Sequence, residues 1–389
     1  MKKFFKTTLL IAFSALFAMS FNSCKKSSSD SSSSSSDDAV KKEIIGQFLG
    51  HTVAPTYSKL ASYSDELVDD LEALKADMNQ ENVNKAAASF LEARHWWEMS
   101  EAFLFGAASD FGIDPHIDSW PLDEAAFNTL MSSPNMIALL AEDEDGTYAG
   151  DNLGNALLGF HGIEYILFRE GQPRPVAEIL DDYMIYAVAV ARDLRNHCVQ
   201  LEVSWIGDDA PAAHVALMEE LEYNTTVNGG DFSYGENMQK AGQAASTYAT
   251  LTQALQAIID GSIDISDEVG SSKIGKPHTG QDPTYVESPY SQKSIIDFYD
   301  NITSVKNAYM GGNEGERDES KSLHAYVKSI DSQLDNRVVE AIDNALAKIS
   351  NMAAPFVNNY ADPSAGEAMT ACQELSDVLS EAKAAIQDN

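Results

Sequence analysis

The chain has 389 residues, of which 60 are Asp or Glu and 26 are Lys or Arg, so its formal net charge is −34 at pH 7. A surface with this charge repels nucleic-acid phosphates and anionic lipid headgroups, which argues against both as partners, and it favours cations. With 3 cysteines in a chain of this length, the protein is not a disulfide scaffold.

The N-terminus has the features of a secretion signal. A basic start, MKKFFK, precedes an apolar run over 7–19 that is too short to span a membrane and suits a signal-peptide core. Small residues then lead to Cys24, an arrangement that resembles a bacterial lipoprotein signal. We therefore predict a signal peptide over 1–23 and a lipid on the Cys24 sulfur, which places the protein on a membrane of the cell envelope. The alternative is a plain secretory signal in which Cys24 is incidental.

A Ser/Asp-rich segment over 24–38 comes next, and its composition predicts a polar tether without a core. After it, apolar residues recur at three- and four-residue spacing along most of the chain. The periodic stretches are 65–78, 177–205, 237–259, 294–310, 336–352 and 367–386. Long amphipathic helices joined by loops predict an all-α fold of two helical bundles packed together.

The middle of the chain is the natural boundary between the two bundles. A polar, glycine-bearing segment at 224–237 interrupts the helical pattern, and we divide the chain into an N-terminal bundle over 39–210 and a C-terminal bundle over 211–389. A second segment without a period, 270–291, is rich in Gly, Pro and Ser. We predict it as a loop, and its length marks it as a candidate functional segment.

Three segments of the first half depart from ordinary bundle patterning, and the first is 93–106 (ARHWWEMSEAFLFG). Arg94, Glu98 and Glu101 fall on one face of the predicted helix. A charged row of this kind is typical of a solvated surface. Because tryptophans and phenylalanines interleave with it, we expect little of the helix to face water, and buried charges need partners. Arg94 is a candidate partner for a glutamate.

The second segment, 114–127, groups acidic residues and a histidine around Trp120 and two prolines. The prolines exclude a regular helix through its middle. Asp118 and Asp123 either cap the next short helix or line a binding loop.

The third segment, 159–168 (GFHGIEYILF), places His161 and Glu164 three residues apart in an otherwise apolar or glycine run. Helix geometry puts both side chains on one face. His161 is either a core histidine bonded to a carbonyl or a metal ligand. Glu164 is either its partner ligand or an ion-pair partner for Arg94 or Arg169. The motif alone does not decide, because His-x-x-Glu is short.

Other metal and nucleophile signatures are missing from the sequence. It contains no His-Glu-x-x-His, so the usual zinc-protease helix is absent. A single Glu-x-x-His, Glu92 to His95, argues against a bundle di-iron centre, which uses two. Cys198 and Cys372 lie in helical runs without an activating histidine pattern, and two buried free thiols are favoured over one long-range bridge.

Taken together, several motifs resemble the imelysin-like family, named for an insulin-cleaving metalloprotease and found among iron-regulated bacterial lipoproteins. They are Gly159-x-His161-x-x-Glu164 with Tyr165, SEAFLFG at 100–106, IDPHIDSWPLD at 113–123, VESPYS at 286–291, and IIDFYDNITSVKNAYMGG at 295–312. They spread over most of the chain after the signal, in the expected order. His116 is a departure, since the resemblance leads us to expect a basic residue there, often arginine.

The resemblance implies an all-helical fold of two bundle-like halves, with the motif residues near their interface, and an association with iron uptake. It makes His161 and Glu164 the metal-binding pair. It places Arg94, Glu101, Asp118 and Asp123 in the surrounding polar cluster, and Ser291, Asp297 and Asn301 facing the same cleft. A nearby Glu98, Glu101 or Asp118 could complete the coordination, and imidazole with carboxylates suits iron or zinc better than calcium or magnesium.

These features favour a lipid-anchored extracytoplasmic protein of iron uptake that binds a metal ion or a small metal-bearing ligand, in contact with an envelope iron-uptake protein. Two alternatives stay open. One is a metallopeptidase that uses the His-x-x-Glu pair, which would also need a third ligand, an open position and a base. The other is a structural or partner-docking lipoprotein whose polar cluster is only a buried ion network.

Overall fold

The structure, a computed structural model, describes residues 30–388. The predicted signal peptide and the lipid attachment residue Cys24 therefore lie outside the described residues. No helix in the described part of the chain is long and apolar enough to cross a membrane. The first helix, α1 (Asp30–Phe48), begins within the segment that the sequence predicted as a tether.

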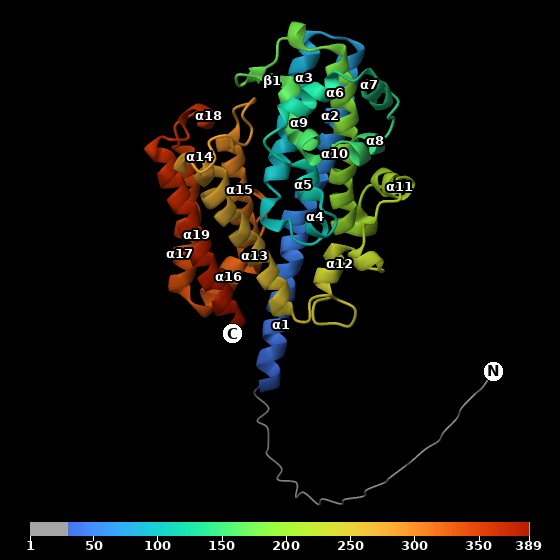
Figure 1. The fold of residues 1–389 in the computed structure, drawn as a ribbon. Coiled ribbons are helices and arrows are strands. Elements are labelled where there is room, and N and C mark those ends of the chain that lie inside the picture. Colours follow the sequence, from blue (N-terminus) through green and yellow to red (C-terminus); the bar gives the residue numbers. More distant parts are fainter. Residues whose placement is uncertain (1–29, 389) are drawn as a thin grey trace, which may run out of the picture. The chain divides into compact units, whose positions relative to one another are not determined.

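Two groups of long helices form the body of the fold, over 38–388, as the sequence predicted (Figure 1). The first group is α2 (Ala54–Ala76), α3 (Gln80–Glu98) and α10 (Asp181–Ile206), with α2 packed on both others. The second group is α13 (Leu251–Glu268), α15 (Ser294–Met310), α16 (Leu323–Ile330), α17 (Ser332–Ser350) and α19 (Pro363–Asp388). The all-α prediction is confirmed, since the described strands are only the two-residue pair β1 (Phe168–Arg169) and β2 (Gln172–Pro173).

Shorter helices fill the connections between the long ones. They are α4 (Ala107–Asp110), α5 (Ile113–Ile117), α6 (Glu124–Met131), α7 (Pro134–Ala141), α8 (Thr147–Asn152), α9 (Gly159–Leu167), α11 (Ala212–Glu220), α12 (Tyr234–Gln239), α14 (Gly275–Thr279) and α18 (Phe356–Asn359). The 3₁₀ turns are η2 (Glu101–Phe103), η3 (Asn155–Leu157), η4 (Val176–Glu178), η5 (Gly207–Asp209), η6 (Val227–Gly229) and η8 (Glu319–Lys321). Two π-helical segments, η1 (Leu49–Val53) and η7 (Val269–Ile274), continue α1 and α13 without a break.

Local sequence explains where several helices start. Asn79 accepts a hydrogen bond from the backbone N–H of Asn82 at 2.9 Å and caps α3. Asp331 does the same for α17, accepting from Gln333 and Leu334. These caps satisfy N–H groups that have no partner within the helix.

Two segments differ from the periodicity-based expectation. The predicted loop over 270–291 is helical as far as Thr279, because α13 continues through η7 and α14. The glycines and serines of this segment interrupt the apolar period from which a helix would be predicted. The helix continues there in the wider π form. In contrast, the predicted helix over 237–259 breaks between α12 and α13, and Thr250 caps the new helix by accepting from Gln253.

The two helix groups share one continuous apolar core. They meet where α15 packs against α3 and where α13 and α15 pack against η2. At the junction, the Phe103 ring contacts Phe48 and Tyr57 edge-on, with centroids 5.9 and 5.4 Å apart. The helices α11 and α12 pack against α10, so the second group starts at α13. The charged residues of α3 and η2 consequently lie at the meeting of the two groups.

Candidate metal centre

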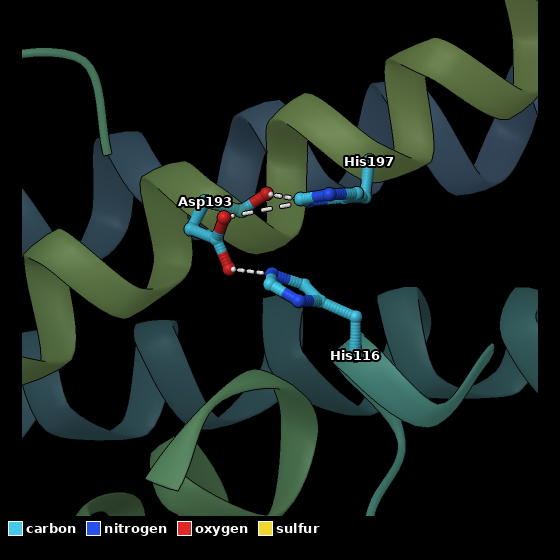
Figure 2. Close-up of side chains that lie close together, drawn as sticks. All are labelled: His116, Asp193 and His197. Carbon is cyan, nitrogen blue, oxygen red and sulfur yellow. Dashed lines mark hydrogen bonds and ion pairs between the residues drawn. The ribbon is translucent and has the colours of Figure 1, made fainter. Parts of the chain in front are cut away.

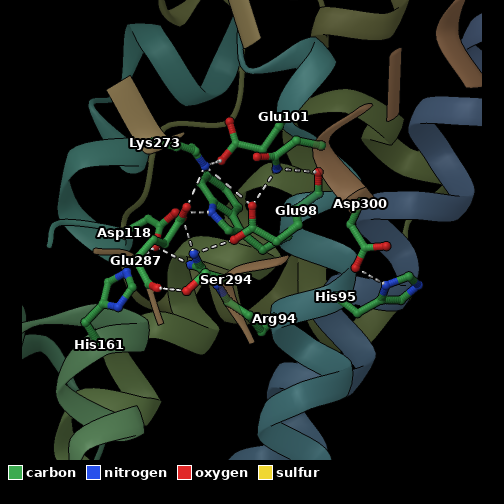
Figure 3. Close-up of polar contacts among 12 residues, drawn as sticks. Arg94, His95, Glu98, Glu101, Asp118, His161, Lys273, Glu287, Ser294 and Asp300 are labelled. Carbon is green, nitrogen blue, oxygen red and sulfur yellow. Dashed lines mark hydrogen bonds and ion pairs between the residues drawn. The ribbon is translucent and has the colours of Figure 1, made fainter. Parts of the chain in front are cut away.

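A buried cluster of charged side chains occupies this meeting point (Figure 3). The segment from α3 to η2 supplies Arg94, Glu98 and Glu101, Asp118 ends α5, and α9 supplies His161 and Glu164. The second half of the chain supplies Lys273 from η7, Glu287 from the following loop, and Asp297 and Asn301 from α15. Each of these side chains is at most 7% exposed.

Gly159 allows α9 to start directly against α5. Its φ is +68°, and a Cβ at this position would lie 1.8 Å from the main-chain oxygen of Ile117. Any other residue would both strain the backbone and force the two helices apart. The glycine before His161 therefore brings the imidazole to Asp118, the residue that follows Ile117.

His161 lies between two carboxylates. Its Nε2 is 3.0 Å from Asp118 Oδ1, and its Nδ1 is 3.5 Å from Glu164 Oε2. Burial alone would lower the pKa of His161, but the contacts with Asp118 and Glu164 outweigh it and raise this pKa to about 9. The ring is therefore a cation in the metal-free protein. A metal ion that binds this ring would displace its proton.

Glu164 is held from the second half of the chain. Its Oε1 accepts hydrogen bonds from the backbone N–H groups of Tyr290 and Ser291, at 3.1 and 2.7 Å. Its Oε2 faces His161 and is a buried oxygen without a hydrogen-bond donor among the described residues. Because one oxygen is fixed by main chain, the other can orient the imidazole.

Arg94 is the central cation of the cluster. Its guanidinium contacts Glu98 and Asp118, and its Nη2 lies 2.6 Å from Glu287 Oε1. Trp97 Nε1 donates to the second Asp118 oxygen at 2.7 Å. Asp118 therefore bridges the arginine and the histidine, and Arg94 together with His161 holds the pKa of that buried carboxyl below its usual range.

Lys273 is the second fully buried cation. Its Nζ lies 3.1 Å from Glu287 Oε1, 3.4 Å from Glu101 Oε1 and 3.6 Å from Glu98 Oε2. Figure 3 shows these carboxylates converging on the ammonium group. It reaches them from η7, where the chain is π-helical, a form often found at functional sites.

The cluster holds more acids than bases. Six buried carboxylates belong to Glu98, Glu101, Asp118, Glu164, Glu287 and Asp297, and the basic side chains among them are Arg94, His161 and Lys273. Burial raises the pKa of Glu287 to about 7 despite the opposing charges of Lys273 and Arg94. Burial also raises the pKa values of Glu101 and Asp297 well above their usual range. Either protonation of some of these carboxylates or a further bound cation would neutralise the excess negative charge.

A pocket of about 210 Å³ leads to the cluster from the protein surface. Its lining includes Glu101 and Asp118 of the cluster together with Asp114, Glu268 and Trp120. Burial and the charge of Asp118 raise the pKa of Asp114 to about 7. The approach to the cluster is therefore acidic and attracts cations. A larger cavity, of about 920 Å³, lies between α10, α11 and η1 and contains no member of the cluster.

The donor set fits a metal ion. One ligand atom each from Asp118, His161 and Glu287 lie within 4.8 Å of one another, and so do atoms from Glu98, Glu101 and Asp118. Within the described residues, Glu164 Oε2, Glu287 Oε2 and Asp297 Oδ2 are buried oxygens that accept no hydrogen bond. Buried polar atoms are rarely left without a partner. Imidazole and carboxylate ligands together suit iron or zinc.

The structure brings most of the sequence-predicted residues into one cluster. Asn301 Nδ2 donates to Glu98 Oε2 at 2.5 Å, and Ser291 contributes its backbone N–H, while its buried hydroxyl makes no hydrogen bond to the described residues. Asp123 is the exception. It is exposed, and its carboxylate accepts from the backbone N–H of Ala126, so it caps α6.

Two central residues were missed by sequence reasoning, Lys273 and Glu287. Lys273 lies in a Gly- and Ser-rich stretch that shows no helical period. Glu287 belongs to the VESPYS motif, from which only Ser291 was selected. A charged residue inside a motif shared with a family was the signal that could have identified Glu287.

Comparisons with known proteins agree with this architecture. The chain is 28% identical over 273 residues to iron-regulated protein A of Synechococcus elongatus, and the match spans 70% of this chain and 65% of that relative. It is also 28% identical to a protein assigned as an iron-regulated protein A precursor from Parabacteroides distasonis, whose crystal structure superposes with a TM-score of 0.76 over 90% of this chain and 95% of that one.

A crystal structure of an imelysin-like protein from Psychrobacter arcticum shares the fold at 14% identity, with a TM-score of 0.58 over 90% of this chain and 93% of that one. The imelysin (Peptidase_M75) family model matches residues 53–382, which include every residue of the buried cluster. This protein therefore belongs to the imelysin family.

Proposed function

We propose that this protein binds a metal ion, iron or zinc, at the buried acid cluster, and that it does so in iron uptake at the cell envelope. The observation that carries the proposal is the excess of buried carboxylates around His161, several with an oxygen that accepts no hydrogen bond from the described residues. A bound cation would offset the buried negative charge and use those oxygens.

The size and charge of the access pocket support an ion as the ligand. Its volume of about 210 Å³ is below the roughly 300–1,000 Å³ of pockets that hold drug-sized molecules. Its acidic lining attracts a cation and repels an anionic chelate. We therefore favour capture of the ion itself over capture of a bulky metal-bearing ligand.

The role in iron uptake and the location rest on other grounds. Two relatives bear the description iron-regulated protein A, which concerns those proteins and motivates the role proposed for this one. The anchoring lipid on Cys24 is a proposal from the sequence motif alone. In this proposal the lipid holds the acid cluster close to the membrane, where an envelope iron-uptake protein could receive or deliver the ion.

Calorimetric titration of the purified chain with Fe²⁺, Fe³⁺ and Zn²⁺ tests the proposal. His161→Ala removes one ligand and should weaken binding at this site by about tenfold or more. Glu164→Gln should weaken it as well, because the amide oxygen stays on the N–H groups of Tyr290 and Ser291 and the NH2 group, which cannot accept a hydrogen bond, then faces the ring. His51→Ala is the matched control, since His51 is an exposed histidine with only a 3.8 Å contact to Glu316. Unchanged binding in His161→Ala would exclude this site, and elemental analysis of protein from its native host would identify the ion.

A further inference from the structure

A second group of metal-capable side chains lies away from the acid cluster. It consists of His116 on α5 and Asp193 and His197 on α10 (Figure 2). One ring nitrogen of each histidine and one oxygen of Asp193 lie within 4.8 Å of one another. Asp193 and His197 are one helical turn apart and share a face of α10, while His116 approaches them from a different helix. Two imidazoles and a carboxylate are a common ligand set for divalent transition metals.

The distances are close to those that a metal ion requires. His116 Nε2 lies 2.9 Å from Asp193 Oδ2, and His197 Nδ1 lies 3.4 Å from Asp193 Oδ1. Two ligands bound to zinc at about 2.0 Å in a tetrahedral arrangement are about 3.3 Å apart. The two rings are also neighbours, with centroids 4.2 Å apart. Only small side-chain movements separate this arrangement from a coordinated one.

One oxygen of Asp193 has no hydrogen-bond donor. Asp193 is completely buried, and its Oδ1 accepts no hydrogen bond from the part of the chain that the structure describes. Gly150 on α8 lies close to this oxygen, since a Cβ there would be 2.3 Å from Oδ1 and 3.7 Å from His116 Nε2. A buried carboxylate oxygen without a partner is unusual in a packed core and is suited to a cation.

The surroundings favour a cation and a neutral histidine. The neighbouring arginines on α10 pair elsewhere, Arg192 with Glu72 and Arg195 with Asp65. Nδ1 of His197 is 2.9 Å from the main-chain oxygen of Asp193 and donates to it; an ion that binds Nδ1 would take the place of this hydrogen, and the imidazole would then carry its proton on Nε2. Burial lowers the pKa of His197. The side chains of His116 and His197 are 20% and 14% exposed, so solvent reaches the group.

We propose that His116, Asp193 and His197 form a second binding site, for a divalent transition metal such as Zn²⁺ or Fe²⁺, separate from the acid cluster. An ion that binds His116 Nε2 takes the place of the hydrogen in its contact with Asp193, and the neutral imidazole then carries its one proton on Nδ1. With three protein ligands, a water molecule completes the coordination. The site joins α5 to α10, so an occupied site would also stabilise the segment that carries Asp118 into the acid cluster.

Titration of the purified full-length chain with Zn²⁺ tests this site, using His161→Ala to silence the acid cluster. This variant should still bind one Zn²⁺ ion. Addition of His116→Ala should weaken the remaining binding by about tenfold or more, and so should Gly150→Ala, whose Cβ would displace the Asp193 carboxylate. His51→Ala in the same background is the control and should bind as its parent does. Thermal melts by circular dichroism establish that each variant is folded.

A second variant covers the case in which loss of His116 unfolds the chain. His116→Gln keeps a side-chain amide that can donate to Asp193, and amides are poor zinc ligands, so it should fold and still lose Zn²⁺. Zinc affinity that is the same in His161→Ala with and without His116→Gln would overturn the proposal, and so would a His161→Ala chain that binds no Zn²⁺. If His116→Gln removes a bound ion and His161→Ala does not, the second site stands and the proposed function at the acid cluster fails.

Discussion

Replacement of Arg94 by methionine would test the charge balance of the acid cluster. The guanidinium is 2% exposed and contacts Glu98, Asp118 and Glu287, which are themselves almost fully buried. Methionine keeps much of the side-chain volume, so the change removes charge and hydrogen bonds more than packing. Loss of one partner from a buried ion pair costs about 3–5 kcal/mol, because the remaining charge is left uncompensated. We expect Arg94→Met to lower the free energy of unfolding by this amount at pH 8.

The pH dependence of this loss has a definite sign. Without Arg94, we expect burial to shift the pKa of the Asp118 carboxyl upward, so that the ionised carboxyl destabilises the variant at high pH and protonation removes this penalty. In the parent chain, the pKa of Asp118 is below its usual range, so the stability that this contributes is present at both pH 8 and pH 5 and is lost only at a pH below the pKa of an unfolded aspartate, about 4. The difference between variant and parent should therefore be smaller at pH 5 than at pH 8 because protonation relieves the variant.

Urea unfolding at 25 °C, at both pH values and without added metal, measures this difference. Arg337→Met is the matched control, since it breaks an exposed pair with Glu381 and should leave stability nearly unchanged. The double variant Arg94→Met/Glu287→Gln should recover part of the loss, because it removes one of the uncompensated acids. A loss below about 1 kcal/mol at pH 8, or a loss that grows as the pH falls, would refute the reasoning.

Three further predictions concern other parts of the molecule. Gly159→Ala should lower the free energy of unfolding by about 2 kcal/mol or more in urea, because φ is +68° and the main chain of Ile117 blocks a Cβ; an unchanged midpoint would contradict the close approach of α9 and α5. His214 contacts Asp65 and Glu202, which raise its pKa to about 9, so its contribution to stability is complete below about pH 6.5 and is lost as the pH rises through 9. The stability difference between the parent and His214→Gln should thus be larger at pH 6 than at pH 10, and an equal difference would oppose a charged His214. Cys198 and Cys372 are buried free thiols, and burial raises the pKa of Cys372 to about 12; a chromogenic thiol reagent at pH 8 should modify both only after denaturation, and, in a Cys24→Ser background, rapid labelling of the folded chain would contradict their burial.

The imelysin-like sequence motifs located most of the acid cluster but not its full composition. Arg94 and Glu98 are four residues apart and His161 and Glu164 three apart, so helix geometry alone places each pair on one face. Their contacts in the structure follow that spacing. Lys273 and Glu287 reach the same cluster from a segment with no helical period, which is why the sequence could not connect them to it.

The sequence could reveal even less of the second group, His116, Asp193 and His197. Asp193 and His197 share a helix, and their spacing could be read from the sequence. His116 comes from a proline-bearing segment 77 positions earlier than Asp193, and Gly150 comes from a third segment. No periodicity relates these segments, because their proximity depends on how α5 and α8 pack against α10.

The sequence by itself determined the helical class, the imelysin-like motifs and the local pairs of charged residues, since each of these depends on spacing within a few turns of one helix. Only the tertiary structure decided that Asp123 caps a helix at the surface while Glu287 joins the buried cluster. The physical reason is that a carboxylate has the same chemistry in both places. Its role is fixed by burial and by partners that are distant in the sequence, and these arise only when the two groups of helices pack together.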